Sequence, residues 1–344
     1  MRVISPFLKH AVYPALHHSG WLKRMAPIGG FAVINYHGLV PAEYKNLDPF
    51  LDGNLLHPEN FRRQLRYLKQ HYRILHPREF RASLENGSPL PARSIMITCD
   101  DGLLNTLTGM LPILRDEDLP CLFFVTGASC GPKPVMLWYE ELYRIMRAGF
   151  LPESLQLPSP QPHSTASQGF PARWWNMVRA ASKLSANERG EWMTRVRQAA
   201  GIDHALQPET RWRLLNPAEL TRLSGAGMEI GAHTVNHPVL SLCRDAEAWH
   251  EIKDCKAQLE LAAGREVWAF AYPFGNAETV GEREIGLARR AGYDCAFLNV
   301  ERWNGASANR FAWPRIHVSL STTLPEFAAH LSGLHFRLQR AAGG

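Results

Sequence analysis

Two short segments of this sequence carry side chains that could bind a metal ion and activate water. Asp100 and Asp101 stand side by side directly after an apolar run over residues 94–98. His233 and His237 follow a second apolar stretch, over residues 228–232. Two carboxylates and two imidazoles can supply the ligands of one divalent cation and leave one carboxylate free to act as a base.

Neither segment is specific when it is considered alone. Adjacent aspartates before a glycine, as in Asp100-Asp101-Gly102, also occur in ordinary turns and helix caps. Successive residues that leave a strand point in different directions, so one aspartate can bind a cation while the other takes a proton from water. Pro238 disfavours a helical backbone at His237, which predicts that both histidines lie on a loop. The two segments together favour a metal site over two unrelated turns.

A third segment, Ala271-Tyr272-Pro273-Phe274-Gly275, also follows an apolar run. Proline restricts the backbone and glycine frees it, and this combination suits a turn that directs a peptide N–H into a cleft. Such a donor could stabilise an oxyanion. The same residues would serve equally well as a simple turn.

The elements expected to position these residues alternate between strand and helix. The predicted strands span residues 31–36, 95–98, 121–125, 228–232, 267–272, 293–298 and 311–318. The predicted helices span residues 58–71, 217–225, 245–263, 282–291 and 324–338. Repeated βα units predict a parallel sheet, and this number of units favours an α/β barrel with its site at the carboxyl ends of the strands.

The domain organisation that we expect has a barrel interrupted by an insertion. The barrel spans residues 31–137 and 214–320, and a helical insertion over 138–213 contains a Pro/Ser/Gln-rich stretch at 157–168. We expect this insertion to cover the site as a lid. Residues 321–344 form a C-terminal helix. Residues 1–30 form a basic, amphipathic helical segment, irregular at Pro14, that either contacts a membrane surface or covers the bottom of the barrel.

Composition places the chain among ordinary globular proteins. It has 344 residues, of which 45% are hydrophobic and 20% charged, and a net charge of +6. The basic residues are scattered and no nucleic-acid-reading motif accompanies them, so we expect no nucleic-acid partner. No run reaches the roughly 18 to 20 apolar residues of a membrane span, and no clear signal peptide is present. The six cysteines lack a C-x-x-C pair, which favours reduced core residues and a cytoplasmic location, with peripheral contact to the inner face of the membrane as an open alternative.

The motifs ITCDDG, HTVNHP and AYPFG, in this order, resemble the successive motifs of the polysaccharide deacetylase (NodB homology) family. The resemblance covers residues 31–318 apart from the insertion. It implies a distorted β/α barrel that removes N- or O-acetyl groups from sugars with a divalent metal, with zinc expected first and cobalt, nickel or manganese as alternatives. Carried across position by position, it implies a general base at Asp100, metal ligands at Asp101, His233 and His237, and an oxyanion donor at the Phe274 amide, beside Tyr272 and Pro273.

This sequence departs from the family pattern at two of these positions. Cys99 stands where the family usually has Phe, and strand alternation directs it away from Asp100, so we expect a core residue rather than a nucleophile. The family often has an arginine in its third motif that steadies the base, and this chain has Ala271 there. We expect Arg315, within Trp313-Pro314-Arg315-Ile316, to supply that charge instead.

The catalytic acid has two candidates. Many members of the family carry a histidine near the C-terminus, and His317 is the nearest match. An exopolysaccharide-modifying subgroup, in which the order of motifs is permuted, resembles this chain more closely. It has a Tyr-His pair on its first strand that matches Tyr36-His37, so we expect His37 to be the acid. A core or capping role for His37 is the alternative.

The reaction expected from this resemblance is hydrolysis of N-acetyl groups on amino sugars of a polysaccharide or a glycolipid precursor, within exopolysaccharide biosynthesis. The partner is accordingly an N-acetylated glycan or a lipid-linked sugar. Two alternatives stay open. The same metal site could act on an O-acetyl ester or on another amide, such as a small cyclic one. A catalytically lapsed barrel could instead only bind glycans.

Overall fold

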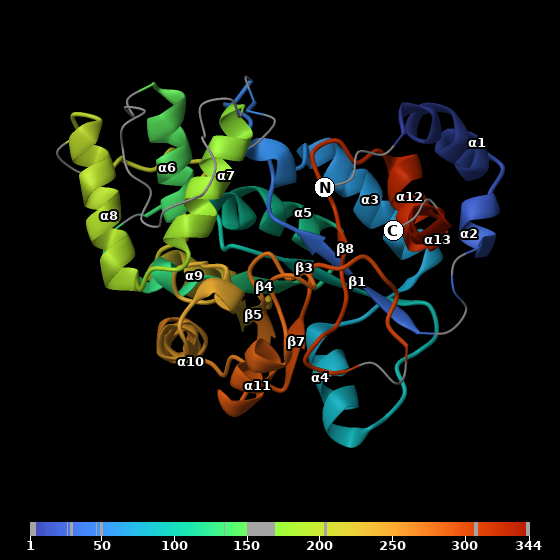
Figure 1. The fold of residues 1–344 in the computed structure, drawn as a ribbon. Helices are drawn as coiled ribbons and strands as arrows, with labels where there is room; N and C mark the ends of the chain where they lie inside the picture. The colour runs from blue at the N-terminus through green and yellow to red at the C-terminus, as the bar shows by residue number, and fades with distance from the viewer. Residues whose placement is uncertain are drawn as a thin grey trace.

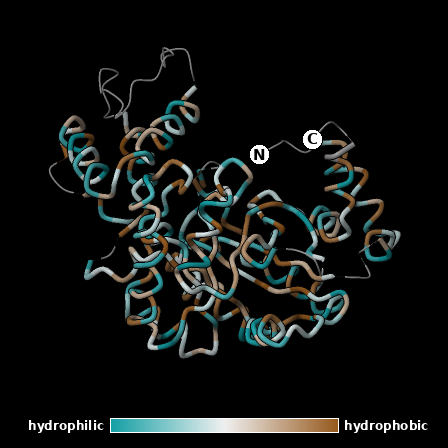
Figure 2. Tube along the Cα trace, turned by 60° about the horizontal axis from the view of Figure 1, so that its bottom comes forward, coloured by the Kyte–Doolittle hydropathy of each residue, from teal (hydrophilic) through white to brown (hydrophobic). Residues whose placement is uncertain are grey.

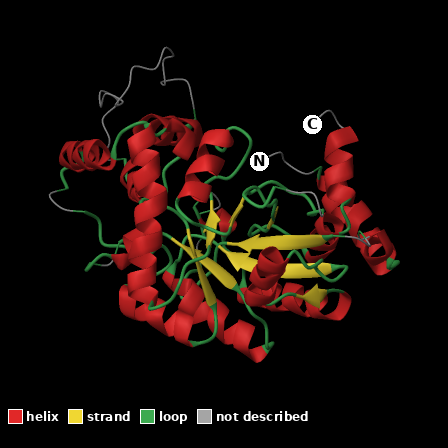
Figure 3. Cartoon of the chain, turned by 90° about the horizontal axis from the view of Figure 1, so that it is seen from below, coloured by secondary structure: helices red, strands yellow, loops and turns green. Residues whose placement is uncertain are grey.

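A computed structural model describes residues 5–25, 27, 30–45, 47–48, 51–133, 135–149, 169–202, 205–305 and 309–341. Its centre is one parallel sheet of eight strands that curls into a barrel with helices around it (Figures 1 and 3). The strand order is β7-β6-β5-β4-β3-β1-β8, and β2 also pairs with β3. The strands are β1 Phe31–Tyr36, β2 Arg73–Ile74, β3 Ser94–Cys99, β4 Leu122–Val125, β5 Glu229–Ala232, β6 Ala269–Ala271, β7 Cys295–Phe297 and β8 Ile316–His317. The predicted α/β barrel is confirmed.

The barrel closes through a broken edge between β7 and β8. The expected strand over 311–318 is wrong in extent, because only Ile316–His317 is a strand. Trp313 exchanges backbone hydrogen bonds with β7, whereas Val318 donates to Asn35 on β1. Pro314 lies between these two pairings and has no N–H to donate, which interrupts the ladder.

Side chains alternate across the sheet and fill two apolar layers. Val33, Met96 and Phe124 belong to a cluster inside the barrel. Their sequence neighbours, such as Ile34 and Ile97, pack in a larger cluster between the strands and the surrounding helices. The helix traces alternate between apolar and polar positions, as an amphipathic helix on a sheet requires (Figure 2).

The helices agree closely with the pattern of apolar residues. They are α1 Tyr13–His18, α2 Trp21–Met25, α3 Pro58–His71, α4 Pro77–Asn86, α5 Leu111–Asp116, α6 Trp138–Arg147, α7 Phe170–Ala181, α8 Ala186–Ala199, α9 Pro217–Gly225, α10 Asp245–Ala263, α11 Glu282–Arg290, α12 Leu324–Leu331 and α13 Leu334–Ala341. The single helix expected over 324–338 is wrong. It is divided into α12 and α13 at Gly333, whose φ of 71° lies in the left-handed region that ends a helix.

Helices α6, α7 and α8 form a group of their own beside the barrel (Figure 1). They share an apolar cluster that includes Leu142, Trp174 and Trp192. The Pro/Ser/Gln-rich stretch at 157–168 lies outside the described residues. Within the part of the chain that is described, no helix is both long enough and apolar enough to cross a bilayer.

Candidate active site

Asp101, His233 and His237 converge at the carboxyl edge of the sheet. Asp101 follows β3, and the two histidines follow β5. The Asp101 Oδ1 atom lies 3.5 Å from His233 Nε2 and 3.4 Å from His237 Nε2. Two ligand atoms that each lie about 2.05 Å from a tetrahedral metal are about 3.3 Å apart. The spacing of these three atoms therefore fits one divalent cation, and all three residues are buried.

The hydrogen bonds around this triad also fit a metal ligand set. His233 donates its Nδ1–H to the Ala271 carbonyl at 2.7 Å, since a carbonyl can only accept, and this leaves Nε2 with a free lone pair. The Asp101 Oδ1 atom is buried and has no hydrogen-bond partner among the described residues. A buried carboxylate oxygen without a partner is costly unless a ligand satisfies it. Burial raises the pKa of Asp101, but the imidazoles of His233 and His237 outweigh burial and hold this pKa well below its usual value.

The loops around the triad contain several non-glycine residues in the left-handed region of backbone conformation. Asp101, Thr234, His237 and Phe274 all have positive φ, between 53° and 74°, although none is glycine. Non-glycine residues in this region cost of order 1 kcal/mol each and persist where the surroundings over-determine them. Gly102 is required by contact, because a Cβ there would lie 2.7 Å from Val125 Cγ1. The backbone is thus bent to aim these side chains.

Asp100 lies next to the triad but is held by a different group. Arg315 donates from Nη1 to Asp100 Oδ1 at 2.6 Å and from Nη2 to Oδ2 at 2.7 Å, and Asn35 donates to Oδ2 at 2.9 Å. Arg315 is fully buried, and its Nε donates to the Leu298 carbonyl. Burial raises the pKa of Asp100, but the guanidinium outweighs it and lowers this pKa below the usual value. Asp100 is therefore ionised and is not shared with the triad.

The structure brings both candidate acids close to Asp100, in different settings. The rings of His37 and His317 are 5.0 Å apart. His37 lines the pocket that contains the triad, whereas His317 is not among its lining residues. Burial and the neighbouring His37 lower the pKa of His317 to about 3, so this imidazole is neutral near pH 7 and a poor proton donor. This geometry favours His37.

The third motif contributes backbone to the pocket rather than a polar side chain. The Phe274 N–H has no acceptor among the described residues, and Phe274 borders the pocket. Tyr272 also borders it, but its hydroxyl donates to the Phe311 carbonyl at 3.0 Å and its ring packs in the core. Pro273 separates these two residues. Cys99 is buried on the opposite face of β3 from Asp100, in the cluster that faces the helices.

Several residues of the site were not found in the sequence. Helices α6 and α7 place Tyr139, Glu140 and Trp174 on the wall of the pocket, which has a volume of about 180 Å³. Burial, and then Asp101, raise the pKa of Glu140 well above its usual value. Glu251 on α10 accepts hydrogen bonds from the Asn236 amide and side chain, and so holds the histidine loop. No motif marks these residues, although the alternation of β1 could have placed Asn35 on the same face as Asp100.

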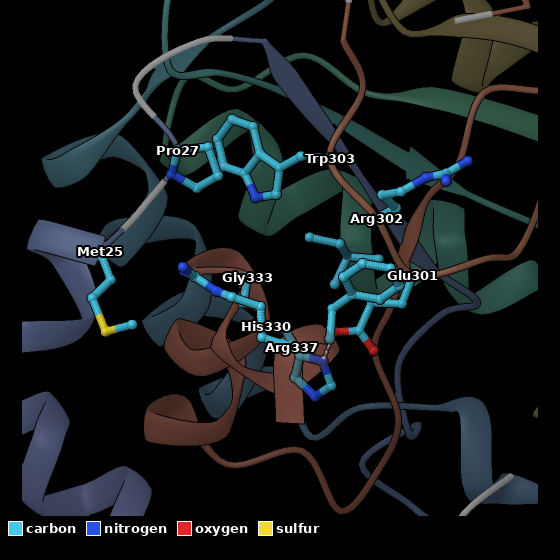
Figure 4. Close-up of a pocket in the computed structure, with 10 residues that line it drawn as sticks. Met25, Pro27, Glu301, Arg302, Trp303, His330, Gly333 and Arg337 are labelled. Carbon is cyan, nitrogen blue, oxygen red and sulfur yellow. Dashed lines mark hydrogen bonds and ion pairs between the residues drawn. The ribbon is translucent and has the colours of Figure 1, made fainter. Parts of the chain in front are cut away.

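A second group of possible ligands lies outside the lining of this pocket and is spaced differently. It consists of Glu301, His330 and His335, of which Figure 4 shows Glu301 and His330. The His330 Nδ1 atom lies only 2.5 Å from Glu301 Oε1, which is the separation of a charge-assisted hydrogen bond and not of two metal ligands. Burial lowers the pKa of His330, but Glu301 and Glu326 raise it further, to about 9. This group is therefore a protonated ion pair that ties the C-terminal helices to the barrel.

Comparison with known proteins supports the resemblance drawn from the motifs. Residues 189–296 match the family model of polysaccharide deacetylase. The deacetylase PplD of Streptococcus pyogenes, solved with acetate, is 17% identical and superposes with a TM-score of 0.55 over 89% of this chain and 99% of its own. IcaB of Ammonifex degensii is 18% identical, with a TM-score of 0.56 over 88% of this chain and 97% of its own.

A de-N-acetylase of Aggregatibacter actinomycetemcomitans is 13% identical, with a TM-score of 0.54 over 87% of this chain and 99% of its own. No curated protein matches the chain. At these identities the solved structures establish the fold, and the family model establishes the similarity to polysaccharide deacetylases. The resemblance predicted from the three motifs is confirmed.

Proposed function

We propose that this protein is a metal-dependent deacetylase that hydrolyses N-acetyl groups on amino sugars of a polysaccharide or a glycolipid precursor. One observation carries the proposal. In a single pocket, Asp101 joins His233 and His237 while the adjacent Asp100 is kept ionised by Arg315. The family similarity supports deacetylation of a polysaccharide.

Asp101, His233 and His237 would hold the metal, most simply zinc, because two imidazoles and a carboxylate form a common ligand set of catalytic zinc. When bound, a divalent metal supplies Lewis acidity toward the acetyl carbonyl and lowers the pKa of water. The unpartnered Asp101 Oδ1 atom and the protonated Nδ1 of His233 prepare the site for this ion.

Asp100 is the base in this proposal. It accepts a proton from the attacking water, and Arg315 fixes the orientation of its carboxylate with two short hydrogen bonds. The Phe274 N–H donates to the oxyanion that develops from the acetyl carbonyl. His37 then donates a proton to the departing amine, which is otherwise a poor leaving group.

The walls of the pocket suit a sugar. Tyr139 and Trp174 contribute aromatic rings to the wall of the pocket, and the Tyr139 ring lies 5.3 Å from the ring of His237. The pocket thus combines aromatic rings with polar groups that can fix the orientation of a ligand, as small-molecule sites do. We therefore assign the sugar ring to this aromatic side and its acetyl group to the carboxylates.

Acetate release provides the test. The purified protein is assayed on oligomers of N-acetylglucosamine, on a lipid-linked N-acetyl sugar and on an O-acetylated glycan, with and without prior removal of metal by a chelator. We expect metal-dependent release from an N-acetylated substrate and no release by Asp100→Asn. Release from the O-acetylated glycan alone would identify an esterase. Glycan binding without any release would indicate the lapsed barrel.

A further inference from the structure

The N-terminal helices present large apolar side chains to solvent. Among the described residues, the exposed large hydrophobic side chains are Phe7, Trp21 and Leu261, at 69%, 55% and 89% exposure. Two of the three are 14 positions apart: Phe7 directly precedes the π-helix η1 (Leu8–Val12), and Trp21 is the first residue of α2. Single exposed apolar residues are ordinary, but the N-terminal helical segment over residues 5–25 exposes two aromatic side chains, and exposed large apolar side chains in one region of a protein indicate an interaction site.

The packing of this segment does not need those two aromatics. Its inner face is anchored by Tyr13, whose hydroxyl lies 2.8 Å from His335 Nδ1, and by Lys9, whose Nζ lies 3.1 Å from a Glu326 carboxylate oxygen. Leu22 is almost fully buried. Helices α1 and α2 lie beside α12, so the N- and C-terminal parts of the chain are neighbours (Figure 1). Phe7 and Trp21 are therefore left on the outer face.

The N-terminal helices themselves carry basic side chains and no acidic ones. The first acidic residue of the chain is Glu43, so α1 and α2 carry no negative side chain. Lys23 and Arg24 on α2 are exposed, as are His10 and His18 on the preceding segment. This arrangement is asymmetric, because acidic and basic residues are nearly balanced over the whole chain, at 32 and 38.

A basic pocket of about 370 Å³ lies between these helices and α3. Its lining includes no acidic residue and consists of His17, Lys23, Arg63, Arg66, Tyr67, Gln70, His71 and Leu324. Arg66 pairs with Glu117, but Lys23 and Arg63 have no ion-pair partner in the described part of the chain. Unpaired cations around one hollow attract an anion such as a phosphate.

Met25 of α2 also borders a second pocket of about 340 Å³, whose exposed surface is mostly apolar although Glu301, Arg302, His330 and Arg337 belong to its lining. Figure 4 shows Met25, Pro27, Trp303 and Arg337 among the residues that line this pocket. Helix α2 thus borders both a basic hollow and a mostly apolar one. A phospholipid surface combines these two properties, with anionic headgroups above an apolar interior.

We propose that the segment of η1 (Leu8–Val12), α1 and α2 docks this protein on an anionic lipid membrane. Phe7 and Trp21 enter the interface between headgroups and acyl chains, where aromatic side chains are favoured. Lys23, Arg24 and Arg63 pair with lipid phosphates. This docking is independent of the hydrolytic activity, since none of these residues borders the active-site pocket.

Co-sedimentation with vesicles tests the proposal on the full chain. The probes are vesicles of phosphatidylcholine alone and of phosphatidylcholine with phosphatidylglycerol at a molar ratio of about 7:3. We expect binding to the anionic vesicles, weakened by salt, and little binding to the neutral ones. The Phe7→Ala/Trp21→Ala variant should bind the anionic vesicles about tenfold more weakly. The Lys23→Glu/Arg24→Glu/Arg63→Glu variant should bind them about 100-fold more weakly.

Leu261→Ala is the control, because it removes an apolar side chain on α10 that is even more exposed than Phe7 and Trp21, and it should leave binding unchanged. Far-UV circular dichroism and acetate release from a soluble substrate verify that each variant is folded. Equal binding of wild type to both kinds of vesicle, or none, would overturn the proposal. Binding that depends on the cationic side chains but not on the aromatic ones would also overturn it, because the protein would then adsorb to any polyanion.

Discussion

The pair of Arg315 and Asp100 gives the sharpest prediction of the structure. Arg315→Met removes the guanidinium and keeps most of the apolar stem. Both partners are buried, and the two contacts measure 2.6 and 2.7 Å. Removing one member of such a pair leaves an uncompensated charge and costs about 3–5 kcal/mol. We therefore expect the free energy of unfolding at pH 7.5 to fall by about that amount.

A double-mutant cycle isolates this interaction. The double variant Asp100→Asn/Arg315→Met removes both charges and should be more stable than Arg315→Met alone. We expect a coupling energy of about 2–4 kcal/mol, measured by urea denaturation of metal-free protein. A coupling energy below about 0.5 kcal/mol, the usual limit of additivity for independent sites, would refute the ion pair as the factor that holds Asp100.

The sign of the pH dependence follows from linkage. Arg315 lowers the pKa of Asp100 in the folded state, so the stabilisation is present above the unfolded pKa and is lost as pH falls through the folded pKa. In Arg315→Met the pKa of Asp100 moves upward, because burial then acts alone. The difference in stability between wild type and variant should therefore shrink as pH decreases from 7.5 toward 4. The acidic limb of the pH–rate profile should also move to higher pH in the variant, and an unmoved limb would contradict the assignment of Asp100 as base.

Three further predictions concern the rest of the site. His233→Ala should lose the bound metal while Asp100→Asn retains it, by elemental analysis of purified protein; the reverse pattern would exchange the roles of ligand and base. His37→Ala should lower the rate of acetate release by about 100-fold or more and His317→Ala by less, and the opposite order would move the acid to His317. Cys99→Ala should keep nearly full activity, because the thiol faces the core; abolished turnover with normal folding would identify a nucleophile.

Local pattern was sufficient to predict the architecture. Apolar runs of strand length alternate with helical periodicity, and this alternation is decided by residues close together in the chain. The helices over 58–71 and 245–263 have the predicted bounds. The two wrong predictions also have local causes: Pro314 interrupts a strand and Gly333 ends a helix.

The site residues that belong to a short motif at the end of a strand could be predicted from the sequence. Asp101 and the pair His233 and His237 lie at strand ends, and parallel strands bring such ends to one edge. The choice between Asp100 and Asp101 depends on backbone torsion, since Asp101 has a φ of 74° that turns its side chain toward the histidines. Alternation alone does not specify such a turn.

The sequence by itself determined the barrel, the three loops and the residue types that they carry, because hydrophobic period and turn chemistry are local properties. The family resemblance suggested Arg315 as the partner of Asp100, 215 positions away, but only the tertiary structure shows the two side chains in contact. It also places Tyr139 and Trp174 on the wall of the pocket, which no motif in the sequence indicated. These contacts join segments that are far apart in the chain, and no local sequence pattern indicates that they will meet. They arise when the barrel closes and the helices dock beside it, since burial then leaves each charged group only the partners that the fold has brought within reach.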